Sequence, residues 1–447
     1  MVPLGDKADG EDGPGSASIA AYLELLQREI AQAPAGPPLS TVYFGGGTPS
    51  MLSAAQVAAL LDALRRRYGL ASGAEITLEM DPASFSRQRL AATLAAGVNR
   101  VSLGGQSFDD GVLEALGRRH RQGDLLEAAG WLRQAQRSGA LRSWSLDLIQ
   151  AAPLAAPLPR PGEPPPPVPA PAPQELRHHW RRQLERAIAL KPPHLSVYDL
   201  IVEPGTVFER LQRRGTLPLP DVDTAADLME LSQALLTAAG YGHYEVSNYA
   251  LPGHASRHNR VYWSGAGWWG FGLGATSAPW GRRLARPRTR EAWAAWLQAG
   301  GGAAERLEAA HPEAAGGGAA VAAGFGGQPI ADSSVETSAR ATGAVDGAGA
   351  AGVGGEPTDG RRLAMPFDEL LLVGLRRREG VNLAALAAAE GLEAPAIEDL
   401  RRHLADFERS GLLRIEGPRW RLSDPEGLAL SNAVLRELLL WWERSGR

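Results

Sequence analysis

The chain has 447 residues, of which 44% are hydrophobic, and it carries a formal net charge of −4 and no cysteine. This charge balance provides no broad basic field for nucleic acid or an anionic membrane. Without cysteine, the residues present cannot form disulfides, thiolate nucleophiles or cysteine-bound zinc and iron–sulfur sites.

Residues 1–16 are expected to be a flexible N-terminus, and their acidic sequence has no apolar core of a signal peptide. Beyond them, helical patterns alternate with short β-rich segments. Strands are predicted at 41–44, 74–79, 99–105, 143–149 and 194–201. Helices are predicted at about 19–32, 54–68, 86–96, 109–116, 124–137 and 175–190. This alternation predicts an α/β fold with a complete or partial (β/α) barrel, and a doubly wound open sheet is the alternative.

Two segments of biased composition interrupt the pattern. Residues 151–173 are rich in proline and are expected to form an exposed insert. Residues 300–360 are rich in glycine and alanine and are expected to be disordered. The first lies within the predicted main domain, residues 17–299, and the second separates that domain from the last one, residues 361–447.

The last domain is predicted to be winged-helix-like and of α+β type. Helices are expected at about 367–377, 383–390 and 395–410, and a hairpin is expected to turn at Gly417-Pro418. The second of these helices has no Arg or Lys, so a packing or lid role is favoured over binding to nucleic acid.

Glycines and polar residues stand at the end of every predicted strand of the main domain. They are Gly45-Gly46-Gly47-Thr48, Glu79 with Asp81, Gly104-Gly105-Gln106, Asp147, and Tyr198 with Asp199. In a (β/α) barrel these ends form the ligand site. The glycine segment lacks the lysine of a P-loop and the spacing of a dinucleotide fingerprint. Bare backbone, a carboxylate such as Glu79 and a cation such as Arg118 or Arg119 instead suit an amino acid joined to a nucleoside.

Several strings also resemble a known family. YFGGGTPS, LEMDPASF, VSLGGQSFDDGVLEALGRRH and WSLDLI, in this order, are similar to radical S-adenosylmethionine (radical SAM) proteins of the oxygen-independent coproporphyrinogen III oxidase type. GYGHYEVSNYALPGHASRHNRVYW and GFGLGATS are most similar to its heme-chaperone (HemW) branch. The resemblance covers most of residues 17–290 and resumes over residues 365–440.

The resemblance implies two ligands and the residues that bind them. For S-adenosylmethionine these are Gly46, Gly47, Thr48, Glu79, Gln106, Arg118, Asp147 and Ile201. The string HNRVYW makes His258 the candidate heme ligand, and nearby His254 is a second candidate. Because axial ligation needs a neutral imidazole, heme affinity is expected to fall as the pH drops through about 6–7. No residue is assigned a catalytic role.

The resemblance also implies a [4Fe–4S] cluster, held in the family by a C-x-x-x-C-x-x-C motif on the first strand. The chain has no such motif. It is therefore expected to be a truncated form whose barrel lacks the first strand, or a degenerate relative without radical chemistry.

Three functions stay open, and whether the chain is an enzyme stays open with them. The first is heme binding and transfer to an accepting protein in tetrapyrrole metabolism. The second is oxidative decarboxylation by an oxygen-independent coproporphyrinogen III oxidase, and the third is an inactive scaffold. HNRVYW favours the first, and the missing thiolates disfavour the second. The sequence favours the cytoplasm, or a plastid or mitochondrion if an N-terminal segment is missing, and shows no membrane-spanning run of ~20 apolar residues.

Overall fold

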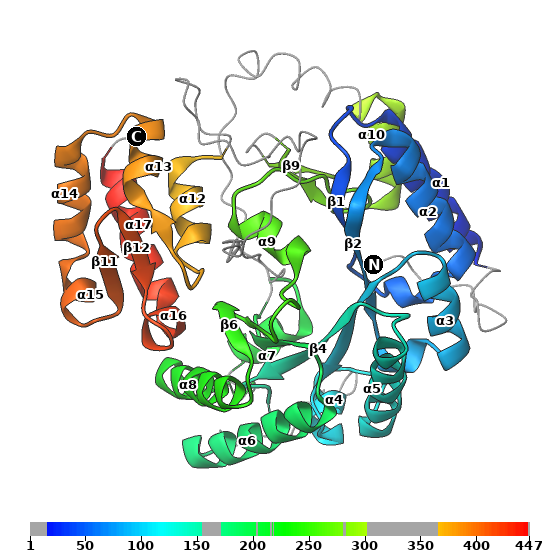
Figure 1. The fold of residues 1–447 in the computed structure, drawn as a ribbon, viewed down its shortest axis with the longest axis horizontal. Helices are drawn as coiled ribbons and strands as arrows, with labels where there is room; N and C mark the ends of the chain where they lie inside the picture. The colour runs from blue at the N-terminus through cyan, green and yellow to red at the C-terminus, as the bar shows by residue number, and fades with distance from the viewer. Residues whose placement is uncertain are drawn as a thin grey trace, which may run out of the picture.

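The structure is a computed structural model that describes residues 16–153, 171–202, 204–214, 217, 219–279, 283–301 and 365–445. A curled sheet forms its centre, helices cover the outside of the sheet, and a smaller domain stands beside it (Figure 1). Residues 1–15, 154–170 and 302–364 lie outside the described ranges. These contain nearly all of the predicted flexible N-terminus, most of the proline-rich insert and all but two residues of the predicted disordered insert.

Five parallel strands make up most of the central sheet, as the alternation predicts. They are β1 (Leu39–Phe44), β2 (Leu70–Met80), β3 (Arg100–Gln106), β4 (Ser143–Gln150) and β5 (His194–Asp199). β7 (Asn248–Ala250) and β6 (Gly242–Glu245) continue the sheet as antiparallel strands, in the order β1-β2-β3-β4-β5-β7-β6. The partial (β/α) barrel is therefore confirmed.

β5 is shorter than the predicted strand 194–201. Its last residue, Asp199, pairs with Gln150, which is the last residue of β4. Ile201 therefore has no backbone partner in β4 and lies in the loop that follows.

Helices connect the strands and pack on the outside of the sheet. They are α1 (Ala17–Gln32), α2 (Ala54–Arg67), α3 (Arg87–Ala95), α4 (Asp110–Ala115), α5 (Gln122–Arg137), α6 (Pro173–Leu190), α7 (Val207–Arg213), α8 (Val222–Ala238) and α10 (Arg290–Gln298). Their ends follow from the sequence: Ser53, for example, forms a capping box with Gln56 at the start of α2. Among the described helices, none is long and apolar enough to cross a membrane.

The two faces of the parallel sheet differ in chemistry. The outer residues are apolar and belong to the main core, including Val42, Ile76, Leu78, Val101, Leu103, Trp144, Leu146, Leu195 and Val197. Alternate residues point to the opposite side. On this inner face they are Thr41, Tyr43, Glu75, Thr77, Glu79, Arg100, Ser102, Ser143, Ser145, Asp147, His194, Ser196 and Tyr198. Since parallel strands are usually apolar on both faces, a polar inner face marks the concave side as the place for a ligand.

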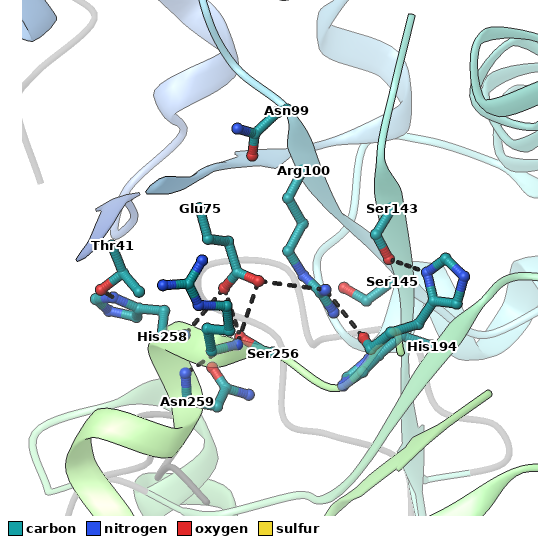
Figure 2. A network of polar contacts seen from close by, with 12 residues as sticks. Thr41, Glu75, Asn99, Arg100, Ser143, Ser145, His194, Ser256, His258 and Asn259 are labelled. Atoms are coloured by element: carbon teal, nitrogen blue, oxygen red, sulfur yellow. Dashed lines mark hydrogen bonds and ion pairs between the residues drawn. The ribbon is translucent and has the colours of Figure 1, made fainter. Parts of the chain in front are cut away.

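A short helix, α9 (Arg257–Trp263), lies against the inner face at the amino-terminal end of β1 and β2. His258 Nδ1 is 3.0 Å from Thr41 Oγ1, and the His258 backbone N–H donates to Glu75 Oε1 at 2.9 Å. Figure 2 shows these contacts together with the ion pair between Glu75 and Arg100, 3.6 Å long. α9 thus closes part of the concave side.

The C-terminal domain contains helices and a three-stranded sheet. Its elements are α12 (Phe367–Gly374), β10 (Val381–Asn382), α13 (Leu383–Glu390), α14 (Ala394–His403), α15 (Ala405–Arg409), β11 (Leu413–Glu416), β12 (Arg419–Leu422), α16 (Glu426–Ala429) and α17 (Ser431–Arg444). The strand order is β10-β12-β11, and the β11–β12 hairpin turns at Gly417-Pro418 as predicted. A C-terminal domain of helices and strands is therefore confirmed.

Two predicted helices of this domain are wrong in detail. The helix predicted at 395–410 is interrupted at Leu404, whose fully buried side chain anchors the bend between α14 and α15 in the domain core. The helix predicted at 367–377 ends at Gly374. It ends there because the Arg376 carbonyl accepts a hydrogen bond from Val246 N and Arg378 N donates to Tyr244 O, which joins this segment to β6.

Candidate functional site

The glycine loop after β1 contains a close backbone approach and two left-handed residues. A Cβ added to Gly45 would lie 2.6 Å from the ring of Tyr43 and 3.0 Å from Glu79 Oε1, so no side chain fits there. Gly46 and Gly47 have φ values of +77° and +65°, and a Cβ on either would meet no atom within 4 Å. The loop therefore presents bare backbone to open space next to Glu79.

Glu79 fixes this loop from the end of β2. Its Oε2 accepts a 2.9 Å hydrogen bond from Gly46 N, and its Oε1 accepts one of 2.8 Å from Tyr43 Oη. Burial raises the pKa of Glu79 in spite of these two hydrogen bonds, and the charge of Asp147 adds to the increase. Neutralising such a carboxylate is favourable, so the site suits a cationic or hydrogen-bond-donating ligand group.

Asp147 on β4 is the second carboxylate of the inner face. Ser102 Oγ donates to Asp147 Oδ2 at 2.7 Å and lies 2.9 Å from Ser145 Oγ. Within the described residues, the buried Oδ1 has no hydrogen-bond partner. Burial raises the pKa of this carboxyl group although the serine hydroxyls and Arg100 oppose the shift. A buried, unpaired carboxylate oxygen needs a donor, and a ligand ammonium or hydroxyl would supply one.

Gln106 ends β3 in a strained conformation, with φ at +61° and a register shift between Gly104 and Gln106. Such left-handed non-glycine residues are often found at functional sites.

Arg118, another predicted site residue, affects the pKa of Asp81 through its charge. Burial raises the pKa of Asp81, but the hydrogen bond and charge of His120, with a smaller contribution from Arg118, lower it overall.

The remaining predicted residues occupy the loops. Thr48 precedes a short 3-10 helix, η1 (Pro49–Met51), and its side chain makes no capping hydrogen bond. Ile201 is 54% exposed. The structure brings Gly46 and Glu79 into contact and places Asp147 within electrostatic range of Glu79. It shows no contact that links Arg118 or Ile201 to them within the described residues, so their role at this site stays a prediction.

His258 is enclosed between α9 and β1. Its Nδ1 faces Thr41 Oγ1 at 3.0 Å, its Nε2 faces Tyr262 Oη at 3.2 Å, and its ring stacks on Tyr43 with centroids 4.7 Å apart. Burial lowers the pKa of His258 to about 4, and the charge of Glu75 only partly opposes this. The imidazole is therefore neutral at physiological pH.

The second histidine candidate, His254, precedes α9. Its Nδ1 is 3.1 Å from Ser143 Oγ, and its backbone carbonyl accepts a 3.0 Å hydrogen bond from Arg100. Burial, together with the charges of Arg100 and Arg142, lowers its pKa. The two histidines thus lie at different places around the start of α9.

Sequence reasoning missed most of the inner face. Tyr43, Ser102, Ser145 and Ser196 line it in addition to the predicted carboxylates. Their signal is the strict alternation in TVYF, EITLE, RVSLG, SWSLD and HLSVY, in which polar residues and glycine occupy every second position. This period of two identifies one polar face in strands that the overall pattern predicts to be parallel.

A cysteine-ligated cluster does not fit the residues present. The chain has no cysteine, and within its described ranges no group of three His, Asp or Glu residues is placed to hold a metal ion. We therefore derive no chemical step through a [4Fe–4S] cluster.

Comparison with family models gives two matches. The radical SAM superfamily model matches residues 16–145, and the HemN C-terminal domain model matches residues 367–429. The solved structure of coproporphyrinogen III oxidase (HemN) from Escherichia coli, described as a radical SAM enzyme, superposes with a TM-score of 0.62 at 19% identity. That match covers 95% of this chain and 82% of HemN and shows that the fold is shared.

Several relatives with higher sequence identity are named as heme chaperones. Heme chaperone HemW of Synechocystis sp. is 39% identical over 281 residues, which are 63% of this chain and 62% of that protein. HemW of Escherichia coli is 39% identical over 277 residues, which are 61% of this chain and 65% of that protein. The mitochondrial radical S-adenosyl methionine domain-containing protein 1 of Bos taurus is 39% identical, over 59% of this chain and 54% of its own length. The chain thus spans less than two thirds of each of these relatives.

Proposed function

We propose that the chain is a heme-binding protein of the heme-chaperone type, because residues 16–145 match the radical SAM superfamily model and residues 367–429 match the HemN C-terminal domain model. The observation that carries this proposal is the environment of His258 in a chain whose relatives are named HemW. Burial keeps the pKa of His258 at about 4, so the side chain is available as the neutral imidazole that binds heme iron.

The two ring contacts of His258 fit different roles in this proposal. Thr41 Oγ1 holds Nδ1, as the outer partner of a metal-binding histidine does, and so orients the ring. Tyr262 Oη occupies the Nε2 side. Heme binding through Nε2 therefore requires Tyr262 to move away, while the Thr41 contact is kept.

We place S-adenosylmethionine at the carboxyl ends of β1–β4. Gly46, Gly47 and Thr48 would supply backbone groups, Glu79 and the free Oδ1 of Asp147 would accept hydrogen bonds from the ligand, and Gln106 would close the rim. Arg118 and Ile201 complete the proposed set on the resemblance alone. Since the chain lacks thiolates, the proposed function includes no radical step.

The proposed protein would transfer heme to an accepting protein in tetrapyrrole metabolism. Bacterial and mitochondrial proteins are both among its relatives, which supports a place in the cytoplasm or in an organelle. The alternative, coproporphyrinogen III oxidation, is supported by the shared fold with HemN but needs a cluster for which this chain has no cysteine ligands.

Heme titration of the full chain tests the proposal. The parent should give a saturable Soret band, and His258→Ala should weaken binding by about tenfold or more, with an unchanged far-UV circular dichroism spectrum. His254→Ala is the matched control and should bind as the parent does. Equal spectra and affinities for the parent and His258→Ala would reject His258 as the ligand, and loss only in His254→Ala would transfer the role to that residue.

A second measurement tests the S-adenosylmethionine site. The parent should bind S-adenosylmethionine weakly, and Glu79→Gln should weaken that binding further. Incubation under anaerobic reducing conditions should give no 5′-deoxyadenosine, and detection of this product would contradict a function without radical chemistry.

A further inference from the structure

A cavity of about 300 Å³ opens at the amino-terminal ends of β3 and β4, beside the middle of β2 and away from the glycine loop. We call it the arginine pocket. Its lining residues are Glu75, Asn99, Arg100, Arg142, Ser143, Gly253, Ala255, Arg257 and Arg260. Four arginines thus surround one space that also contains a single glutamate.

The carboxylate of that glutamate is already occupied. Glu75 accepts hydrogen bonds from Ser256 Oγ at 3.3 Å, Arg257 N at 3.2 Å and His258 N at 2.9 Å. It also lies 3.6 Å from Arg100 Nη1 (Figure 2). One carboxylate therefore faces four arginines in this pocket, and it is hydrogen-bonded to the start of α9.

Arg100 lacks one partner that a buried guanidinium requires. The residue is only 4% exposed, and its Nη1 donates to the His254 carbonyl at 3.0 Å. Its Nη2 is buried and, among the described residues, has no hydrogen-bond partner. Buried donors are nearly always satisfied, so an unpaired donor on a residue that lines a cavity supports an acceptor bound nearby.

The other arginines of the pocket come from two places: Arg142 directly precedes β4, and Arg257 and Arg260 belong to α9. Arg142 is exposed, and Arg257 is half-buried with its Nη1 donating to the Gly73 carbonyl at 2.8 Å. The positive charge of the pocket also affects the pKa of a neighbouring histidine, His194. Burial lowers the pKa of His194 well below its usual value, and the charge of Arg100 lowers it further.

We propose that the arginine pocket binds an oxyanion of the carboxylate or phosphate class. Guanidinium groups present planar pairs of N–H donors that match such anions. A volume of about 300 Å³ suits a small anionic group rather than a whole tetrapyrrole. The anion can come from two sources: a propionate of heme bound beside α9, or a free anion such as phosphate.

Calorimetric titration of the full chain with inorganic phosphate and with succinate tests the site itself. Saturable binding is expected for at least one of them. Arg142→Gln should weaken it by about tenfold, because a charge-assisted hydrogen bond is lost, and Arg142→Gln/Arg257→Gln should abolish it. Arg409→Gln removes the same charge from an exposed residue of α15 and should leave binding unchanged.

Heme and heme dimethyl ester, which lacks free carboxylates, identify the source of the anion. If propionate enters the pocket, the parent should prefer heme to the ester, and the double variant should lose this preference. If the parent binds phosphate or succinate but does not distinguish the two hemes, the anion is a free one. The pocket proposal is overturned if neither small anion binds saturably and the parent does not distinguish heme from its ester. Failure of both heme forms to bind, with small-anion binding retained, would reject the proposed heme function and leave the anion site intact.

Discussion

Asp147 and Glu79 are carboxyl groups whose pKa values are raised by burial on the inner face of the sheet. A raised pKa in the folded protein means that ionisation at neutral pH costs folding free energy. Residues that lower stability in this way are typical of binding sites, where a ligand offsets the cost. Burial also disfavours the charged form of His258. Because the charged form of histidine is the protonated one, burial lowers its pKa instead of raising it.

Replacing Asp147 with asparagine should separate stability from binding. Asp147→Asn removes the unfavourable buried charge and should raise the free energy of unfolding at pH 7 by about 1 kcal/mol. It should also weaken binding of S-adenosylmethionine, because the ligand loses an ionic acceptor. Thermal unfolding and ligand titration check the two effects. Ser196→Ala, which removes a neighbouring hydroxyl that supports the ionised form, is the control and should not stabilise the protein.

His258 should make stability depend on pH below neutrality. Its pKa of about 4 in the folded chain lies below the unfolded value of about 6.5, so the unfolded chain binds the extra proton first as the pH falls. The folded state should lose up to about 3 kcal/mol between pH 6.5 and pH 4 through this residue. Urea unfolding should show a flatter pH dependence for His258→Gln than for the parent. His178→Gln, on the exposed side of α6, should follow the parent curve.

The same pKa changes the expectation for heme. The fall in affinity that sequence alone predicts at pH 6–7 assumes an ordinary histidine, and burial shifts the titration to about pH 4. That expectation is corrected: ligation by His258 should be nearly constant from pH 8 to pH 5. An affinity that halves near pH 6.5 would identify a different, more exposed ligand.

α9 is held against the sheet mainly by one acidic residue. Glu75 is 5% exposed and joins three donors at the start of α9 to Arg100 of β3. Glu75 thus contacts both the backbone of His258 and the wall of the arginine pocket. The helix is too short to be stable alone, so its position depends on tertiary contacts.

Removing this carboxylate should be far more damaging than removing a surface one. Glu75→Ala leaves Arg100 buried without its counter-charge and should cost about 3–5 kcal/mol of unfolding free energy. Asp62→Ala breaks an exposed ion pair with Arg65 on α2 and should cost at most about 0.5 kcal/mol. Urea unfolding of both variants measures the difference. Similar small losses in the two variants would contradict the anchoring role of Glu75.

The two domains meet where α9 and β6 contact α12. Trp263 is 1% exposed and packs with Met365 and Val373, and backbone hydrogen bonds join β6 to residues 376–378. His243 Nδ1 adds a contact of 2.7 Å with Asp424. The segment that contains His258 is therefore in contact with the central sheet on one side and with the C-terminal domain on the other (Figure 1).

Trp263→Ala should loosen this junction. A cavity of that size costs about 3–5 kcal/mol, and hydrogen exchange should become faster in α9, β6 and α12 while β2–β4 stay protected. Trp441→Ala is the matched control, because Trp441 lies in the C-terminal core. It should speed exchange in α17 and its neighbours without affecting α9. Unchanged exchange in α9 after Trp263→Ala would show that the domain contact does not support the heme-ligand segment.

Local chemistry in the sequence determined the order and type of most elements. Alternating periods of two and of three to four residues predict the five parallel strands and their crossover helices, and glycines with strand-end carboxylates predict the rim. The polar alternation of the inner face is also present in the sequence, although the strand ends considered one by one do not reveal it. These features depend on neighbours in the chain, which is why sequence reveals them.

Only the tertiary structure decided what surrounds the functional side chains. His258 meets Thr41 across 217 positions and Glu75 across 183 positions, and no local pattern specifies such contacts. The end of β5 at Asp199 depends on where β4 ends, and the bend at Leu404 depends on burial in another part of the domain. The pKa of His258 and the convergence of four arginines on one pocket follow from the same long-range packing. Burial and electrostatic interactions depend on distance in space. The sequence therefore supplies the ionisable side chains, and the fold determines their pKa values and partners.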